Sequence, residues 1–291
     1  MKKEAIDISS LNIANKSPDE AIQEIKAGAN DVHIPTPVME PPAEVVELPS
    51  HGALYKDVTD DPDILEGKIR IRPMTLTEEK ILATTRLIKT GQALDMVFRN
   101  CIKSKIDPLD LLSSDRLYLM FYLRGISYGN EYTFTLRCPN PNCGRQFRYT
   151  VDISQQPVKE MGEDIEEPIK VELPKTKAII YYHLPRGRDE VALRKLEEKT
   201  LHTSDVDNSA TERFIRLIDR IEAPDGTELE KKEWRSFLNS LIAYDISYLR
   251  EDMSEKDGGI EAIKSLTCPY CAEEFDADIP ITVDFFRVRA R

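Results

Sequence analysis

Two short cysteine-containing turns constrain the fold of this chain more than any other feature of its sequence. The first is Cys138-Pro-Asn-Pro-Asn-Cys143, and the second is Cys268-Pro-Tyr-Cys271. In both turns a phenylalanine follows the closing cysteine by four residues, and strand-like segments lie on either side. The pattern indicates two copies of a strand–turn–strand unit, one in the middle of the chain and one near its C-terminus.

The spacing of these cysteines is typical of a structural metal site. Two thiolates on one tight turn can both reach a single ion at Zn–S distances of about 2.3 Å, and a second turn completes a tetrahedron. We therefore expect one structural zinc ion per chain, bound by Cys138, Cys143, Cys268 and Cys271. Four thiolates leave no open coordination position for catalysis. Because metal binding contributes to folding, a chelator should loosen the whole body.

Other roles for the cysteines remain as alternatives. A disulfide framework is disfavoured in an intracellular protein. A redox-active pair at Cys268 and Cys271 would not explain the matching pair upstream, and the turns could also persist without metal. The fifth cysteine, Cys101, lies on an apolar helical face and is expected in the core. The histidines have no ligand spacing and receive no role.

Composition excludes several classes of protein. The 291 residues carry 40 Lys and Arg against 52 Asp and Glu, which gives a net charge of −12. Duplex DNA and anionic lipid both require concentrated positive charge, so neither is an expected main ligand. No segment approaches the roughly 20 apolar residues of a membrane span, and no apolar region follows Met1-Lys2-Lys3 as in a secretory signal. We expect a soluble, intracellular protein.

The acidity is concentrated in residues 1–67, which hold five Lys or Arg and 14 Asp or Glu. This segment also contains seven prolines and one candidate helix over residues 17–26. It is either a disordered acidic linker or an extended arm that orders on a partner. In the second interpretation the apolar side chains anchor the arm: Ile34, Val38, Met39, Val45, Val46, Leu48, Leu54 and Tyr55.

Residues 68–291 are predicted to form an α+β body. We expect a mainly helical segment over 73–128, the first cysteine turn with short β-hairpins over 129–184, a second helical segment over 185–257, and the second cysteine turn with strands over 260–291. Within these segments, 146–153 and 178–184 alternate like strands, whereas 209–221 has helical spacing. The two cysteine turns together would form a zinc-ribbon-like element that joins the middle of the chain to its C-terminus.

Motifs that would indicate an enzyme are missing from the sequence. There is no phosphate-binding glycine loop, no Gly-x-Ser-x-Gly elbow and no His-Glu-x-x-His. Nothing assembles a nucleophile, a base and an orienting group, so no catalytic residue and no small-molecule substrate are expected. Two alternatives remain, a redox dithiol enzyme and a zinc-dependent nucleic-acid-binding module. The second would use arginines near the turns and the C-terminus: Arg137, Arg145, Arg148, Arg287 and Arg289.

Several further stretches occur in a characteristic order. They are Ile71–Thr75 with Glu78–Leu82, Asp95–Ile102, Asp115–Gly129, the two cysteine turns, Trp234 with Phe237 and Leu238, and Val283–Phe286. In order and spacing, these stretches resemble the T-even-type phage baseplate hub proteins, a family that includes hub subunits and hub-assembly chaperones. The resemblance covers about residues 68–291 and leaves the proline-rich segment outside.

The resemblance implies a non-enzymatic protein of a contractile-tail virus. Its partners would be other phage baseplate and tail proteins, and it would be assembled in the host cytoplasm and located in the virion baseplate. Our leading hypothesis is a structural protein that docks at or near the hub through a zinc-stapled body and an N-terminal arm. The alternative is an assembly chaperone that is absent from the mature particle.

Overall fold

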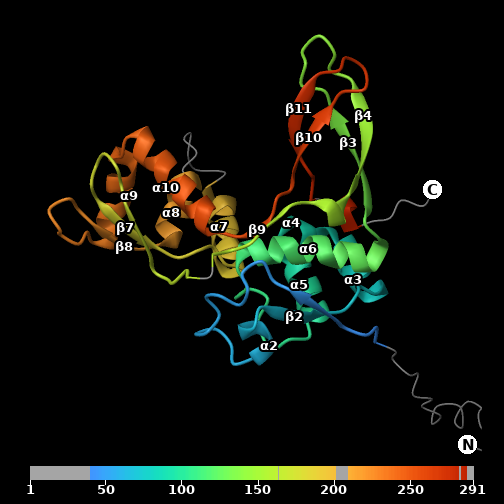
Figure 1. Ribbon diagram of the computed structural model, residues 1–291, viewed down its shortest axis with the longest axis horizontal. Helices are drawn as coiled ribbons and strands as arrows, with labels where there is room; N and C mark the ends of the chain where they lie inside the picture. The colour runs from blue at the N-terminus through green and yellow to red at the C-terminus, as the bar shows by residue number, and fades with distance from the viewer. Residues whose placement is uncertain (1–39, 163, 201–208, 282, 287–291) are drawn as a thin grey trace, which may run out of the picture. The chain divides into compact units, whose positions relative to one another are not determined.

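The computed structural model describes residues 40–162, 164–200, 209–281 and 283–286. Helices alternate with short antiparallel sheets along this part of the chain, so the expected α+β class is confirmed (Figure 1). The chain divides into residues 1–40 and residues 41–291, and the elements below belong to the second unit.

The folded body begins before residue 68. Strand β1 (Glu44–Glu47) pairs antiparallel with β2 (Lys68–Ile71), and helix α2 (Pro62–Leu65) lies between them, with Asp61 as its N-cap. Val46, Leu48 and Tyr55, expected in an arm that contacts a partner, are each at most 5% exposed within this chain's own core. The folded body therefore starts at about residue 43 and not at residue 68. Burial in the core stabilises these apolar side chains more than exposure to solvent would.

Four helices follow β2. They are α3 (Leu76–Ala83), α4 (Thr85–Lys89), α5 (Gln92–Cys101) and α6 (Ser113–Tyr128). Helix α3 begins with a capping box, in which Thr75 and Glu78 satisfy each other's backbone amides. Gly91 separates α4 from α5 with a φ of 64°, a left-handed conformation that glycine adopts without strain. Cys101 is fully buried in the core, as expected.

Two hairpins carry the cysteine turns. Strands β3 (Glu131–Arg137) and β4 (Gln146–Asp152) form one, and β10 (Ile263–Thr267) and β11 (Glu274–Asp278) form the other. They lie side by side in Figure 1, although each remains a separate two-stranded sheet. The turns η3 (Ile153–Gln155) and η4 (Val283–Phe286) follow the hairpins. Near their base, the Tyr132 hydroxyl donates to the carbonyl of Pro280 at 3.0 Å.

The segment between the hairpins is closed at its own base. Strands β5 (Val158–Lys159) and β9 (Gly259–Ile260) pair antiparallel, so the chain leaves and returns at one point. The enclosed residues form a three-stranded sheet and a group of helices. The sheet contains β6 (Ile169–Glu172), β7 (Ile179–Tyr182) and β8 (Ile218–Glu222), and the helices are α7 (Gly187–Thr200), α8 (Ser209–Leu217), α9 (Lys231–Ser240) and α10 (Ala243–Lys256).

The helix expected over residues 209–221 is only partly correct, because its last residues form strand β8. Helix α8 ends at Leu217, and the next five residues pair with β7. Ile218 and Ile221 are both buried there, with Ile221 directly opposite Ile180. Isoleucine favours strands because its branched side chain packs well on a pleated surface. The free edge of β7 therefore decides the conformation of this segment.

The buried side chains form two separate cores. The larger core extends from Val46 to Phe286 and includes the helices and the three-stranded sheet. The smaller core lies between the two hairpins and has only three buried members, Cys138, Phe147 and Cys268. So small an apolar cluster gives the ends of the hairpins that carry the turns little support, whereas Tyr132 and Phe134 nearer the base belong to the larger core.

Candidate metal centre

The two cysteine turns have the same local construction. The amide of Cys138 donates to the carbonyl of Arg145 at 2.9 Å, and the amide of Cys268 donates to the carbonyl of Glu273 at 2.8 Å. These bonds close each turn directly beyond the last residue pair of its hairpin. The internal repeat that the sequence indicates is thus also a repeat in backbone structure.

The residue after each closing cysteine is left-handed. Gly144 has a φ of 55° and Ala272 has a φ of 59°. Glycine adopts this conformation freely, whereas an alanine must accept some strain because of its Cβ atom. The two turns thus end in the same backbone conformation, although they differ in length.

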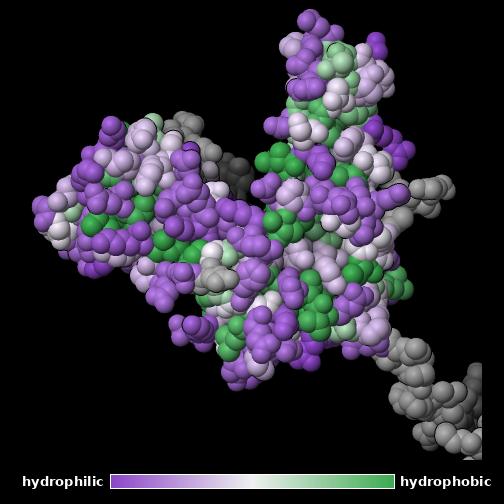
Figure 2. Space-filling view, viewed as in Figure 1, coloured by the Kyte–Doolittle hydropathy of each residue, from purple (hydrophilic) through white to green (hydrophobic). Residues whose placement is uncertain are grey.

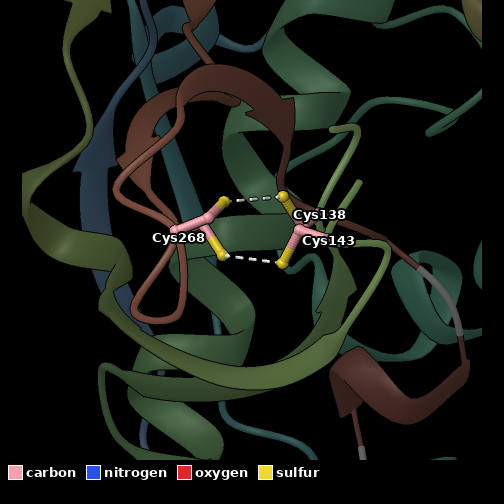
Figure 3. A group of neighbouring side chains, drawn as sticks. Cys138, Cys143 and Cys268 are labelled. Carbon is pink, nitrogen blue, oxygen red and sulfur yellow. Dashed lines mark hydrogen bonds between the residues drawn. The ribbon is translucent and has the colours of Figure 1, made fainter. Parts of the chain in front are cut away.

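The structure brings all four cysteines together. Their sulfur atoms lie within 4.8 Å of one another, although Cys143 and Cys268 are far apart in the sequence. Figure 3 shows two close sulfur pairs, which join Cys138 to Cys271 at 3.6 Å and Cys143 to Cys268 at 3.9 Å. A tetrahedron with Zn–S bonds of about 2.3 Å has edges of about 3.8 Å. The four sulfur atoms therefore have the donor chemistry and approximate spacing of a four-thiolate zinc site.

All four cysteines are free thiols. Burial and the neighbouring thiols raise the pKa of Cys138 to about 12. Burial also opposes ionisation of Cys268, but the backbone amides of Tyr270 and Cys271 point at its sulfur and lower its pKa to about 7. Without a cation the cluster therefore holds protons, and a bound metal would displace them.

Few contacts besides the cysteines connect the two hairpins near their turns. The rings of Phe147 and Phe275 meet edge to face with centroids 6.4 Å apart. The Arg145 guanidinium lies 5.2 Å from the centroid of the Tyr270 ring. Asn140 Nδ2 donates to Glu273 Oε2 at 3.3 Å. These contacts are partly exposed, so the cysteine cluster is the main candidate for holding the hairpins together.

Those predicted arm residues that the structure describes do not form one surface. Ile34, Val38 and Met39 lie outside the described residues, and Val46, Leu48 and Tyr55 are in the core. Leu54 is half-buried at a positive φ of 66° and packs against that core. Val45 is 60% exposed on β1. In the described chain, Val45 is the predicted anchor that remains available to a partner.

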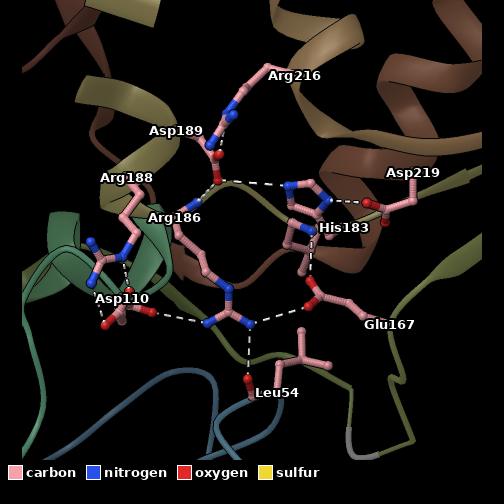
Figure 4. Close-up of polar contacts among 10 residues, drawn as sticks. Leu54, Asp110, Glu167, His183, Arg186, Arg188, Asp189, Arg216 and Asp219 are labelled. Carbon is pink, nitrogen blue, oxygen red and sulfur yellow. Dashed lines mark hydrogen bonds and ion pairs between the residues drawn. The ribbon is translucent and has the colours of Figure 1, made fainter. Parts of the chain in front are cut away.

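The sequence did not reveal a polar network centred on Arg186 (Figure 4). Its guanidinium donates to the carbonyls of Asp110 and Leu54, at 3.0 and 2.9 Å, and pairs with Glu167 at 3.2 Å. It also lies over the ring of Tyr55. Arg186 therefore joins the N-terminal part of the body to the segment between the hairpins. No motif signals these contacts, because each partner comes from a different part of the chain.

A cavity of about 630 Å³ lies beside this network and is lined by His183, Asp189, Arg213 and Arg250, among others. The ring nitrogens of His183 face two carboxylates: Nδ1 lies 3.0 Å from Asp219, and Nε2 lies 3.8 Å from Asp189. Asp189 is also bound by Arg216 at 2.7 Å. Both ring nitrogens of this histidine are thus directed at carboxylates.

The fold and the cysteine cluster define an α+β protein in which two hairpins bring four cysteines together. The chain belongs to the family described as T4 bacteriophage base plate protein, whose sequence model matches residues 43–287. The match begins at β1 and extends past η4. No curated protein and no solved structure is similar enough to this chain to count as a match. None of the described helices is both long enough and apolar enough to cross a bilayer.

Proposed function

We propose that this protein is a non-enzymatic structural component of the phage baseplate, positioned at or near its hub. In this proposal one zinc ion joins the two hairpins, and the body and the N-terminal segment dock onto other baseplate subunits. The family supports the baseplate assignment. The observation that carries the docking role is the convergence of four thiols from two distant hairpins, because a structural clip stiffens a surface without providing a reactive position.

The metal is tested by elemental analysis of the purified full-length protein. We expect one zinc per chain in the wild type and a loss of zinc in both Cys138→Ser and Cys268→Ser. Cys101→Ala is the matched control, since Cys101 is buried in the main core and should leave the metal content unchanged. Retention of zinc by either serine variant would refute a shared site and return the thiol chemistry of the second turn to consideration.

The role of the N-terminal segment is tested by deleting it, and the structure indicates where the deletion should end. Removal of residues 1–67 would also remove Val46 and Tyr55 from the core, so the appropriate deletion ends at residue 39. We expect the shortened protein to unfold at the same temperature as the full chain but to enter reconstituted baseplates poorly. Normal incorporation would refute a docking role for this segment.

A permanent structural role also predicts a fixed amount of the protein in finished particles. Quantitative mass spectrometry of purified phage should find the protein in a constant ratio to other baseplate subunits. Its absence from mature particles, together with a requirement during assembly, would instead identify an assembly chaperone. In that case the metal clip could still be correct, because the metal measurement is independent of the particle.

A further inference from the structure

The paired hairpins form a two-layer plate whose outer faces differ in charge. Alternation along β3 and β4 directs Tyr132, Phe134 and Phe147 inward, and alternation along β10 and β11 directs Leu266 inward. The intervening residues of both hairpins are exposed. In Figure 2, hydrophilic side chains lie along both outer sides of this pair and more hydrophobic ones lie between them.

The outer face of the first hairpin is basic in the half that carries the cysteine turn. Arg148 lies opposite Thr135, and Arg137 lies opposite Gln146, so both arginines are on the same face. Arg145, on the adjoining turn, is exposed but reaches across to the Tyr270 ring of the second hairpin, so the face depends on Arg137 and Arg148. This half of the face contains no acidic side chain.

The outer face of the second hairpin is acidic at the same level. Glu274 lies opposite Thr267, and Asp276 lies opposite Ser265, which places both carboxylates on one face. Glu273, on the turn, points instead toward the first hairpin, where its carboxylate accepts from Asn140. On each hairpin the charged residues stand at the first and third register pairs from the cysteine turn, and the two turns meet at one cluster.

These opposite charges cannot neutralise each other within one chain. Packed sheets are separated by about 10 Å, and the two charged faces point away from one another. No ion pair in the described chain involves Arg148, Glu274 or Asp276. The protein therefore presents two complementary surfaces on opposite sides of one plate.

We propose that a second copy of this chain occupies these surfaces, with the basic face of one plate docking against the acidic face of the next. Such a contact is heterologous, because it joins two different patches, and repetition of it produces a ring or a filament. The inference goes beyond the proposed function, since neither the metal nor the N-terminal segment requires self-association.

Acidic residues at the base of the plate limit the contact to the half that carries the cysteine turns. There Glu131 lies opposite Asp152 on the first hairpin, and Asp278 lies on the acidic face of the second. If two plates aligned along their full length, these acids would meet and repel. The contact is therefore expected to be small, sensitive to salt and strongest where an assembly holds the copies close together.

The experiment is sedimentation velocity on the full-length protein and on two charge reversals, Arg148→Glu and Asp276→Lys. We expect the wild type to associate, with a dissociation constant that rises about tenfold between roughly 0.05 M and 0.5 M salt. Each variant alone should associate at least about tenfold more weakly than the wild type, because like charges then face each other. Lys170→Glu, at an exposed position of strand β6, is the matched control and should associate like the wild type.

Mixing the two variants provides the decisive comparison. Each keeps one original face, and the two reversed faces complement each other, so an equimolar mixture should recover association. A wild type that stays monomeric at about 100 μM and low salt would overturn the proposal. Failure of the mixture to associate would also overturn it. Weaker association of Arg148→Glu together with unchanged association of Asp276→Lys would overturn it as well, because the basic face would then meet an acidic patch other than the proposed one. Unchanged zinc content and circular dichroism would separate these outcomes from loss of the metal clip.

Discussion

Asp115 is a fully buried carboxyl group, and its titration should make the protein more stable as the pH falls from neutral. It accepts hydrogen bonds from the amide of Ser50 at 3.2 Å, the hydroxyl of Ser50 at 2.5 Å and the hydroxyl of Tyr55 at 2.7 Å. Burial raises its pKa from 3.8 to about 6, and the charge on Asp257 acts in the same direction. The hydrogen bonds only partly oppose this shift.

The sign follows from the two pKa values. The folded protein binds the proton of Asp115 more tightly than the unfolded chain does, so ionisation above about pH 6 destabilises the fold. Lowering the pH from about 7.5 to 5 should therefore raise the free energy of unfolding by about 1.4 kcal/mol. The full gain, about 3 kcal/mol, requires a pH below the unfolded value of 3.8.

The assay is urea unfolding of the wild type and of Asp115→Asn at both pH values. The midpoint of the wild type should rise by about 0.5 M at the lower pH, for a slope of about 2–3 kcal/mol/M. The asparagine variant does not titrate, so it should lack this rise. Protonation of the four clustered thiols affects both proteins equally and cancels in the comparison. An identical rise in the variant, or a loss of stability in the wild type, would refute the reasoning.

Four further substitutions test other parts of the structure. Glu78→Gln should cost about 3 kcal/mol at neutral pH because it breaks a buried pair with Arg72. The pKa of Glu78 is about 2 in the folded protein, against 4.5 in the unfolded chain. The loss of stability caused by Glu78→Gln, measured by urea unfolding, should therefore shrink as the pH falls below about 4.5. A loss that does not change with pH would contradict this explanation. Ala272→Gly should raise the melting temperature of the hairpins by relieving a positive φ, and Gly144→Ala should lower it, each through about 0.5–1 kcal/mol. Equal shifts of one sign would argue against backbone strain. Tyr55→Phe should cost about 1–3 kcal/mol in urea unfolding, because a buried carboxylate and a backbone amide each lose a partner, and an unchanged midpoint would refute that account.

The cysteine turns were predictable because their information is local. A Cys-Pro pair, a short turn and a phenylalanine four residues later identify each unit, and the chemistry of thiolates explains why two such units should meet. The alternation in residues 146–152 likewise identifies a strand without reference to the rest of the chain. Short-range patterns of this kind do not depend on distant partners.

The start of the body was not predictable in the same way. Prolines and acidic residues before residue 68 indicate an exposed segment, and Glu44 and Glu47 are indeed exposed on β1. Val46 nevertheless faces the core between them. Composition averaged over a long window conceals alternation in a four-residue strand, and only the partner strand β2 decides that these residues are ordered.

The sequence predicts that a chelator loosens the whole body, but the separation of the two cores indicates that only part of the chain should be affected. If the metal held the whole body, its removal would expose residues throughout the chain. The structure instead closes the segment between the hairpins by pairing β5 with β9, and its sheet packs into the main core without contacting the cysteine cluster. The small core has only three buried residues and should open once the clip is lost. Hydrogen exchange after zinc removal should therefore lose protection in the halves of the hairpins next to the cysteine turns, residues 135–148 and 265–276. Protection should persist at the base of β3, where Tyr132 and Phe134 belong to the main core, and in residues 169–182 and 218–222. Uniform loss of protection would show that the clip supports the whole body, and retention in both hairpins would show that their packing does not need a metal.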